Sequence, residues 1–182
     1  MMNLPNKITL TRVFMIPLYL IFMLVEGIPY GRLIAAIVFT LAAISDAVDG
    51  YIARKQNLVT NFGKFMDPIA DKLLVCSALI CFVEASQMPS WIAIIIISRE
   101  FIIGGFRLIA SDNNVVLAAS WWGKIKTNVQ IIMSILLTLD LNYPIINVLE
   151  IISMYLALAL TVISLVDYMY KNRQLLYIKN IK

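Results

Sequence analysis

An apolar segment continues without a break into Ser45-Asp46-Ala47-Val48-Asp49-Gly50-Tyr51-Ile52-Ala53-Arg54. Positions 46, 49, 50 and 53 follow the i, i+3, i+4, i+7 spacing of a helix, so we expect both carboxylates and both small residues to share one face. Gly63, Asp67 and Asp71 then recur at every fourth position, which predicts a second pair of carboxylates on one face of the next helix. Asp67 followed by Pro68 predicts the N-cap and first turn of that helix.

The chain around these acids is unusually apolar. It has 182 residues, of which 61% are hydrophobic and 14% charged, with a mean hydropathy of +0.86. A soluble domain of this size has too little interior for that much apolar surface, so most of it is expected to face lipid. The apolar runs predict an all-α, polytopic integral membrane protein that forms a single embedded domain over residues 1–182. The six predicted transmembrane helices cover about 8–25, 32–54, 68–84, 90–110, 126–139 and 145–170.

The charges orient this stack of helices. All of the 15 lysine and arginine residues except Arg32 and Arg99 fall at the two termini and the even-numbered loops, whereas the odd-numbered loops carry acids. The positive-inside rule therefore predicts that both termini and the second and fourth loops are cytoplasmic, with the acidic motif at the cytoplasmic surface of the membrane. Basic loops also account for the net charge of +4, so the charge is no indication of nucleic-acid binding. The three tryptophans, at the ends of predicted segments, are expected to anchor the helices at the membrane interface.

The residue types that are missing narrow the chemistry. The chain has no histidine, which excludes histidine-based zinc sites and Ser–His or Cys–His catalysis. Cys76 and Cys81 lie five positions apart within one apolar segment, and we interpret them as small buried hydrophobic residues. Carboxylates, Arg, Lys, hydroxyl groups and backbone remain as functional groups.

Four aspartates at the membrane surface need partners. An unpaired carboxylate there costs about 2.5–3.5 kcal/mol even on the most lenient insertion scale, and the two stripes contain too few basic residues to pair all four. We therefore predict that the two helices face each other and that the four acids bind two divalent cations, Mg²⁺ or Mn²⁺, which clamp a phosphoryl group. The predicted ligands are Asp46, Asp49, Asp67 and Asp71.

Other interpretations remain open at this point. Single aspartates near helix ends are often caps or interfacial charges. An ion-coupled transporter also places carboxylates within a bundle, although it commonly shows an internal repeat, which we do not find in this sequence. An intramembrane aspartyl protease needs two such acids, not four with a glycine pattern.

The full pattern D-x-x-D-G-x-x-A-R-x8-G-x-x-x-D-x-x-x-D, over residues 46–71, resembles the signature of the CDP-alcohol phosphatidyltransferases at all eight fixed positions. Enzymes of this family transfer a phosphatidyl group from CDP-diacylglycerol to an alcohol and release CMP. The resemblance implies a metal-dependent homodimer of six-helix subunits in which Asp71 accepts the proton of the attacking hydroxyl. It also implies that CDP binds to Asp46, Gly50, Ala53, Arg54 and Gly63.

Three further stretches resemble the branch of the family whose acceptor is glycerol 3-phosphate: residues 3–12, 98–107 and 123–127. Arg99 and Arg107 lie eight positions apart on one predicted helix, and Lys124 and Lys126 begin the next. We predict that these four cations form a pocket for the acceptor phosphate, although the two lysines are equally explained as cytoplasmic surface charges. Inositol phosphate, serine and phosphatidylglycerol stay open as alternative acceptors.

Overall fold

A computed structural model of the chain describes residues 4–55, 61–112 and 120–173, and within them the side chains of residues 9–45, 69–110 and 120–173. These residues form helices and no strands, which confirms the predicted all-α class. The six helices are α1 (Leu4–Leu24), α2 (Gly31–Lys55), α3 (Asn61–Glu84), α4 (Ser90–Asp112), α5 (Trp121–Leu139) and α6 (Pro144–Lys171).

Two helices begin earlier than the apolar runs suggest. α3 begins at Asn61, so Asp67 and Pro68 lie inside it, and the predicted N-cap at Asp67 is wrong. Polar residues extend the helix beyond the apolar segment, and a proline near a helix start removes one backbone hydrogen bond without ending the helix. α5 begins at Trp121, where the Ser120 side chain accepts a hydrogen bond from the backbone N–H of Gly123 and caps the first turn.

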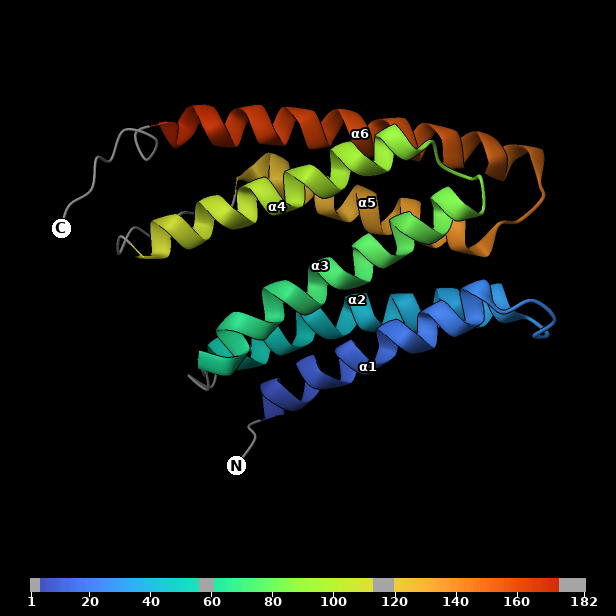
Figure 1. Cartoon of the computed structure of the whole chain (residues 1–182), viewed down its shortest axis with the longest axis horizontal. Helices are drawn as coiled ribbons and strands as arrows, with labels where there is room; N and C mark the ends of the chain where they lie inside the picture. The colour runs from blue at the N-terminus through green and yellow to red at the C-terminus, as the bar shows by residue number, and fades with distance from the viewer. Residues whose placement is uncertain (1–3, 56–60, 113–119, 174–182) are drawn as a thin grey trace.

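The helices run alternately in opposite directions (Figure 1), so α2 ends and α3 begins at the same end of the bundle. We call this the signature end, and α1, α4, α5 and α6 also place their first or last turns there. At the opposite end, short turns join α1 to α2, α3 to α4 and α5 to α6. The acidic motif therefore shares one end of the molecule with the start of α5 and the last turns of α4.

α3 lies between two groups of helices, α1 with α2 and α4 with α5 and α6 (Figure 1). α2 packs against both α1 and α5, and its residues Ala35, Phe39 and Ala42 belong to the buried core. The Tyr19 hydroxyl and the Thr138 hydroxyl form a 3.2 Å hydrogen bond between α1 and α5. The small side chains on α2 allow the neighbouring helices to approach closely, and the hydrogen bond satisfies two buried hydroxyl groups.

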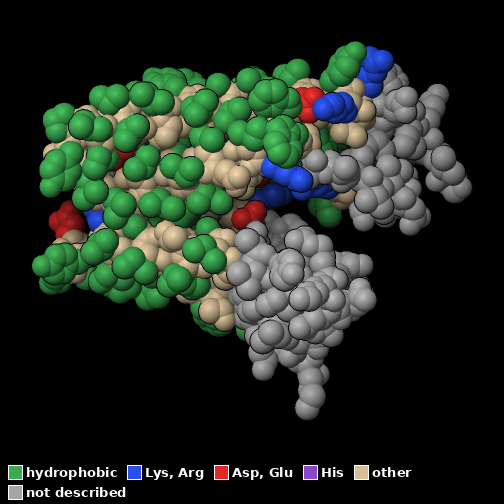
Figure 2. All heavy atoms as spheres, turned by 180° about the vertical axis from the view of Figure 1, so that it is seen from behind, with side chains coloured by type: hydrophobic (Ala, Val, Ile, Leu, Met, Phe, Trp, Pro, Cys, Tyr) green, Lys and Arg blue, Asp and Glu red, His purple; other side chains and the backbone are tan. Residues whose placement is uncertain are grey.

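Large apolar side chains are exposed on all six helices, including Phe14 at 68% and Ile145 at 76%. Figure 2 shows hydrophobic side chains spread over much of one face of the bundle. Among the described residues, α6 is the one helix that is both long enough and apolar enough to cross a membrane by composition, with a mean hydropathy of 2.2. Thr9–Leu24 and Gly31–Ser45 are shorter apolar helical stretches. α4 is as long as a membrane span, with 23 residues, but it contains Arg99, Glu100 and Arg107.

Candidate functional site

The family-like motif lies on two helices at the signature end. Residues 46–54 belong to the uninterrupted last turns of α2, as the shared face predicted from their spacing requires, and residues 63–71 belong to α3. α2 and α3 are in contact with each other. The side chains of Asp46, Asp49, Gly50, Ala53, Arg54, Gly63 and Asp67 lie outside the described residues, whereas that of Asp71 is described.

Asp71 lines a small cavity between α2, α3, α4 and α5. The cavity has a volume of about 90 Å³, which is room for several water molecules. Its polar lining comes from three helices: Asp71 and Lys72 from α3, Glu100 from α4, and Lys126, Thr127 and Gln130 from α5. Apolar residues, among them Phe39 and Leu74, complete the walls. We call this space the Asp71 cavity.

Glu100 joins two of the predicted acceptor-binding cations. Its carboxylate accepts a hydrogen bond from Arg99 Nη1 at 2.9 Å and another from Lys126 Nζ. The three side chains are 17%, 9% and 2% exposed for Glu100, Arg99 and Lys126, respectively. Arg99 Nε also donates to Ser164 Oγ on α6 at 3.2 Å, so the group ties α4, α5 and α6 together. This cluster contains two cations and one carboxylate. The excess positive charge favours the binding of an additional anion.

The first turn of α5 approaches Arg99 closely. A Cβ placed on Gly123 would lie 3.3 Å from Arg99 Nη2, so a larger residue at 123 would crowd the guanidinium. The guanidinium therefore lies against the N-terminal turn of α5, where backbone N–H groups and the helix dipole attract negative charge. Within the described site, we expect an anion to be attracted most strongly to the place where Arg99, Lys126 and this turn lie together.

Arg107 and Lys124 lie outside this buried group. Arg107 is exposed on α4, and its guanidinium carbon stands 5.9 Å from the ring centroid of Tyr168 on α6. Lys124 is exposed on the first turn of α5. Of the four cations predicted to hold the acceptor, the structure brings Arg99 and Lys126 together and leaves Arg107 and Lys124 nearer to solvent.

Lys72 is a cavity residue that the sequence analysis counted merely as a surface charge. Its ammonium group packs directly over Gly104 of α4, at a position that a Cβ on residue 104 would occupy. The neighbouring Gly105 has open space around its Cα. Gly104 therefore provides room for Lys72 to reach the cavity that Asp71 lines.

The sequence analysis also missed a buried polar stripe on α5. Lys126, Gln130, Ser134 and Thr138 follow one another at four-residue spacing, and all four are buried. This spacing within an apolar segment is a signal that could have identified Gln130 before the structure. The contact of Glu100 with Lys126 lies between two helices, so no spacing along one helix could have predicted it.

The chemistry of the predicted metal ligands suits Mg²⁺ or Mn²⁺, because four carboxylates provide hard oxygen donors. The described side chains contain no group of three or more acids or cysteines close enough to hold a metal, but the side chains of three predicted ligands, Asp46, Asp49 and Asp67, are not among them. Asp71, the fourth, lines the cavity beside two basic residues. The two-metal site thus stays a prediction that fits the donor set.

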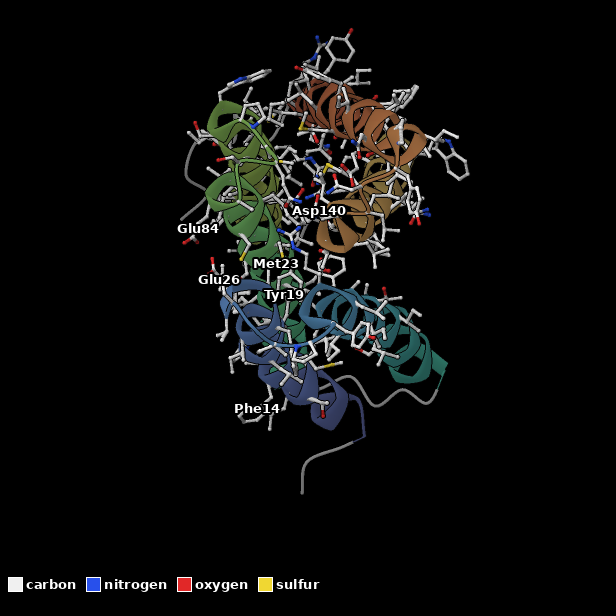
Figure 3. The ribbon with its side chains drawn as sticks, turned by 90° about the vertical axis from the view of Figure 1, so that its right-hand side faces the viewer. Phe14, Tyr19, Met23, Glu26, Glu84 and Asp140 are labelled. Carbon is white, nitrogen blue, oxygen red and sulfur yellow. The ribbon has the colours of Figure 1, made fainter. Side chains whose placement is uncertain are left out.

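A larger hollow of about 550 Å³ lies at the opposite end of the bundle, between the α1–α2 turn and the end of α3. Figure 3 looks onto this end and shows Glu26 and Glu84, both of which line the hollow. Nearby, Arg32 pairs with Asp140 at 2.5 Å, with both side chains about 40% exposed. Glu26 and Glu84 are exposed to solvent, whereas Arg32, which also lines the hollow, has a buried Nη1 atom.

Comparison with known proteins gives a consistent assignment. Residues 2–163 match the model of the CDP-alcohol phosphatidyltransferase family. The chain is 46% identical to the CDP-diacylglycerol–glycerol-3-phosphate 3-phosphatidyltransferase of Bacillus subtilis (strain 168), over 99% of this chain and 100% of the relative. It is 39% identical to the Haemophilus influenzae protein of the same name, over 92% of this chain and 91% of the relative. A probable phosphatidylglycerophosphate synthase of Mycobacterium tuberculosis (strain H37Rv) is 40% identical over 91% of this chain and 79% of the relative. The chain belongs to the CDP-alcohol phosphatidyltransferase family.

Proposed function

We propose that this protein transfers the phosphatidyl group from CDP-diacylglycerol to glycerol 3-phosphate, giving phosphatidylglycerophosphate and CMP. The observation that carries the proposal is the Asp71 cavity, where a signature carboxylate lies beside Lys126 and Glu100 at the end of the bundle that holds the whole motif. The names of full-length relatives support the same reaction.

The buried cations are suited to a phosphorylated acceptor. Arg99 and Lys126 are held on either side of Glu100 and are shielded from water, which strengthens their attraction for a phosphate. Arg107, exposed on α4 beside Tyr168, adds positive charge outside the buried cluster. A choline or ethanolamine acceptor would instead require an acidic or aromatic cage.

Asp71 is the proposed general base. The acceptor hydroxyl oxygen attacks the phosphorus that bears the diacylglycerol, its proton passes to an Asp71 carboxylate oxygen, and the bond from that phosphorus to the CMP oxygen breaks with its electron pair. Glu100 holds Arg99 and Lys126 so that the acceptor phosphate is placed before the hydroxyl reacts. Most of the rate enhancement then comes from positioning and electrostatics.

Asp46, Asp49, Asp67 and Asp71 are the residues proposed to hold two divalent ions, Mg²⁺ or Mn²⁺. When bound, such ions neutralise the diphosphate and stabilise the departing phosphate of CMP. Gly50, Ala53, Arg54 and Gly63 are proposed to contact the cytidine diphosphate together with Asp46, because these positions match the family motif.

We also propose that all six helices cross the bacterial inner membrane and that the signature end faces the cytoplasm. Helix lengths of 19 to 28 residues match a hydrocarbon core of about 30 Å. Trp91 lies at one end of the bundle, and Trp121 and Trp122 lie at the other, all exposed, as interface anchors would be. The exposed apolar surface also provides room for a second copy in a homodimer and for contact with membrane lipids.

One assay tests the reaction. Purified protein in detergent or vesicles receives CDP-diacylglycerol, Mg²⁺ or Mn²⁺, and one acceptor from a panel of glycerol 3-phosphate, inositol phosphate, serine and phosphatidylglycerol. We expect CMP release and a new lipid with glycerol 3-phosphate, loss of both with EDTA, and recovery when the divalent ion is added in excess.

The same assay separates the alternatives. CMP release with another acceptor in place of glycerol 3-phosphate would keep the reaction class and overturn the acceptor. No CMP release with any acceptor, together with ion flux across protein-loaded vesicles, would favour a transporter and overturn the enzyme proposal.

A further inference from the structure

Gln130 lies one helical turn beyond Lys126 on the buried face of α5 and lines the Asp71 cavity. The residue is 2% exposed. Its side-chain Nε2 is buried without a hydrogen-bond partner among the residues that the structure describes. An unsatisfied buried amide costs free energy, so a ligand that accepts its hydrogen bond gains selectivity over one that does not.

The other members of the polar stripe differ from Gln130. Lys126 is paired with Glu100, and Thr138 donates to the Ser134 carbonyl oxygen at 2.7 Å. Ser134 Oγ also has no partner among the described residues, but Ser134 is not part of the cavity lining. Gln130 thus combines an unused donor with a place in the wall of the cavity that holds the proposed base.

We propose that Gln130 determines acceptor specificity by donating a hydrogen bond from Nε2 to the acceptor hydroxyl that does not react. This inference rests on the proposed function. In glycerol 3-phosphate, one hydroxyl attacks and the opposite carbon carries the phosphate, which leaves the middle hydroxyl as the group to be recognised.

The placement of the charges supports a hydroxyl rather than a phosphate as the partner. The phosphate is expected at Arg99, Lys126 and the first turn of α5, where positive charge is concentrated. Gln130 is neutral and lies four residues beyond Lys126, about 6 Å farther along the helix axis, so it is positioned to meet the acceptor away from its phosphate. A buried neutral donor suits a neutral hydroxyl, whereas a phosphate dianion needs charge-assisted bonds.

The test compares glycerol 3-phosphate with 3-hydroxypropyl phosphate, which has the same phosphate and primary hydroxyl but lacks the middle hydroxyl. We expect the kcat/KM of the wild-type protein to be about tenfold lower for the analogue than for glycerol 3-phosphate, because the loss of one hydrogen bond costs about that factor. Equal use of the two acceptors by the wild type would overturn the inference without any variant.

Gln130→Met keeps the length of the side chain and removes the donor. We expect kcat/KM for glycerol 3-phosphate to fall about tenfold, to the level of the analogue, while the analogue is used as before. Ser134→Ala, which removes a buried polar group one turn away, is the matched control and is expected to keep the tenfold preference. Equal losses for both acceptors in Gln130→Met, or loss of the preference in Ser134→Ala, would give Gln130 a packing role and overturn the inference.

If Gln130→Met does not fold, Gln130→Asn provides the same comparison, since it withdraws the amide by one carbon. Failure of this inference is distinct from failure of the proposed function. A wild type that releases no CMP with glycerol 3-phosphate refutes the function, whereas a wild type that turns over but shows no preference for the middle hydroxyl refutes the role of Gln130 alone.

Discussion

Charged side chains are buried at one end of the bundle and partly exposed at the other. At the signature end, Arg99, Glu100 and Lys126 are buried and bound to one another beside a cavity of about 90 Å³. At the opposite end, Arg32 and Asp140 form a pair that is about 40% exposed, near an open hollow of about 550 Å³. The smaller cavity is the better candidate site, because a charge gains strength for binding when water is excluded from it.

Size alone would have selected the wrong end. Glu26 and Glu84 line the larger hollow (Figure 3), but each is exposed to solvent and forms no ion pair with another residue that the structure describes. Charges that stay exposed to solvent at the end of a helix cost little free energy, whereas buried charges require compensation by partners or by a ligand. The cost of burial therefore distinguishes a site from a surface.

The largest expected difference between the ends concerns turnover. Asp71→Asn removes the proposed base and is expected to lower kcat by about 10³-fold or more, while the protein still elutes as folded in detergent. The matched control is Asp140→Asn at the opposite end, which is expected to keep wild-type kcat. Near-normal turnover in Asp71→Asn would remove Asp71 as the base.

Stability should separate the ends next. Glu100→Gln leaves Arg99 and Lys126 buried without their shared carboxylate, so we expect a loss of about 3–5 kcal/mol in the free energy of unfolding, seen as a lower Tm in detergent. Asp140→Asn breaks the exposed pair with Arg32 and should cost about 1 kcal/mol or less. Asn also suits the left-handed backbone at residue 140, with φ of 46°. Similar losses in the two variants would contradict the contrast drawn between them.

The two adjacent glycines of α4 test the role of Lys72. Gly104→Ala places a Cβ where the Lys72 ammonium lies, and we expect kcat/KM to fall about tenfold because the lysine leaves the cavity. The end of a lysine side chain moves easily, so the Tm should change little. Gly105→Ala adds the same methyl group into open space and is expected to keep kcat/KM within about twofold. Equal activity in the two variants would show that the position of Lys72 is unimportant.

The smallest expected effect is at the rim of the site. Arg107→Ala should raise the KM for glycerol 3-phosphate about fivefold with little change in kcat, because an exposed cation contributes modestly to binding. Arg173→Ala is the control, since Arg173 also stands over a tyrosine ring, that of Tyr170, at 5.0 Å on α6. If the KM is unchanged in Arg107→Ala, Arg107 does not bind the acceptor, and the acceptor pocket consists of the buried cluster alone.

Much of the fold followed from local patterns in the sequence. The order and approximate extent of the helices came from apolar runs separated by turns, and the all-α class is confirmed. The starts of α3 and α5 were missed because polar residues extend those helices beyond the apolar segments. Asp67 and Pro68 imitate a helix start, although the helix already begins at Asn61.

Prediction of the site was uneven for a similar reason. The structure brings Arg99 and Lys126 together at Glu100 and leaves Arg107 and Lys124 nearer to solvent, and the binding of the acceptor phosphate by these four cations stays a prediction. Depth within a bundle depends on how the helices are rotated against one another, which spacing along a single helix does not reveal. Lys72 was missed because its contact with Gly104 lies between two helices, whereas the four-residue spacing of Gln130 from Lys126 is a signal that the sequence already contained.

The sequence was sufficient to predict the reaction class through its resemblance to a family signature, because that signature is a local pattern on two consecutive helices. Its positions are Asp46, Asp49, Gly50, Ala53, Arg54, Gly63, Asp67 and Asp71. Packing added what spacing cannot contain: Lys126 meets Glu100 across 26 positions, Arg99 meets Ser164 across 65, and Lys72 rests on Gly104. Such contacts depend on the relative placement of helices that are distant in the chain. Periodicity assigns a residue to a face of its own helix, whereas the neighbours of that face are known once the helices are assembled.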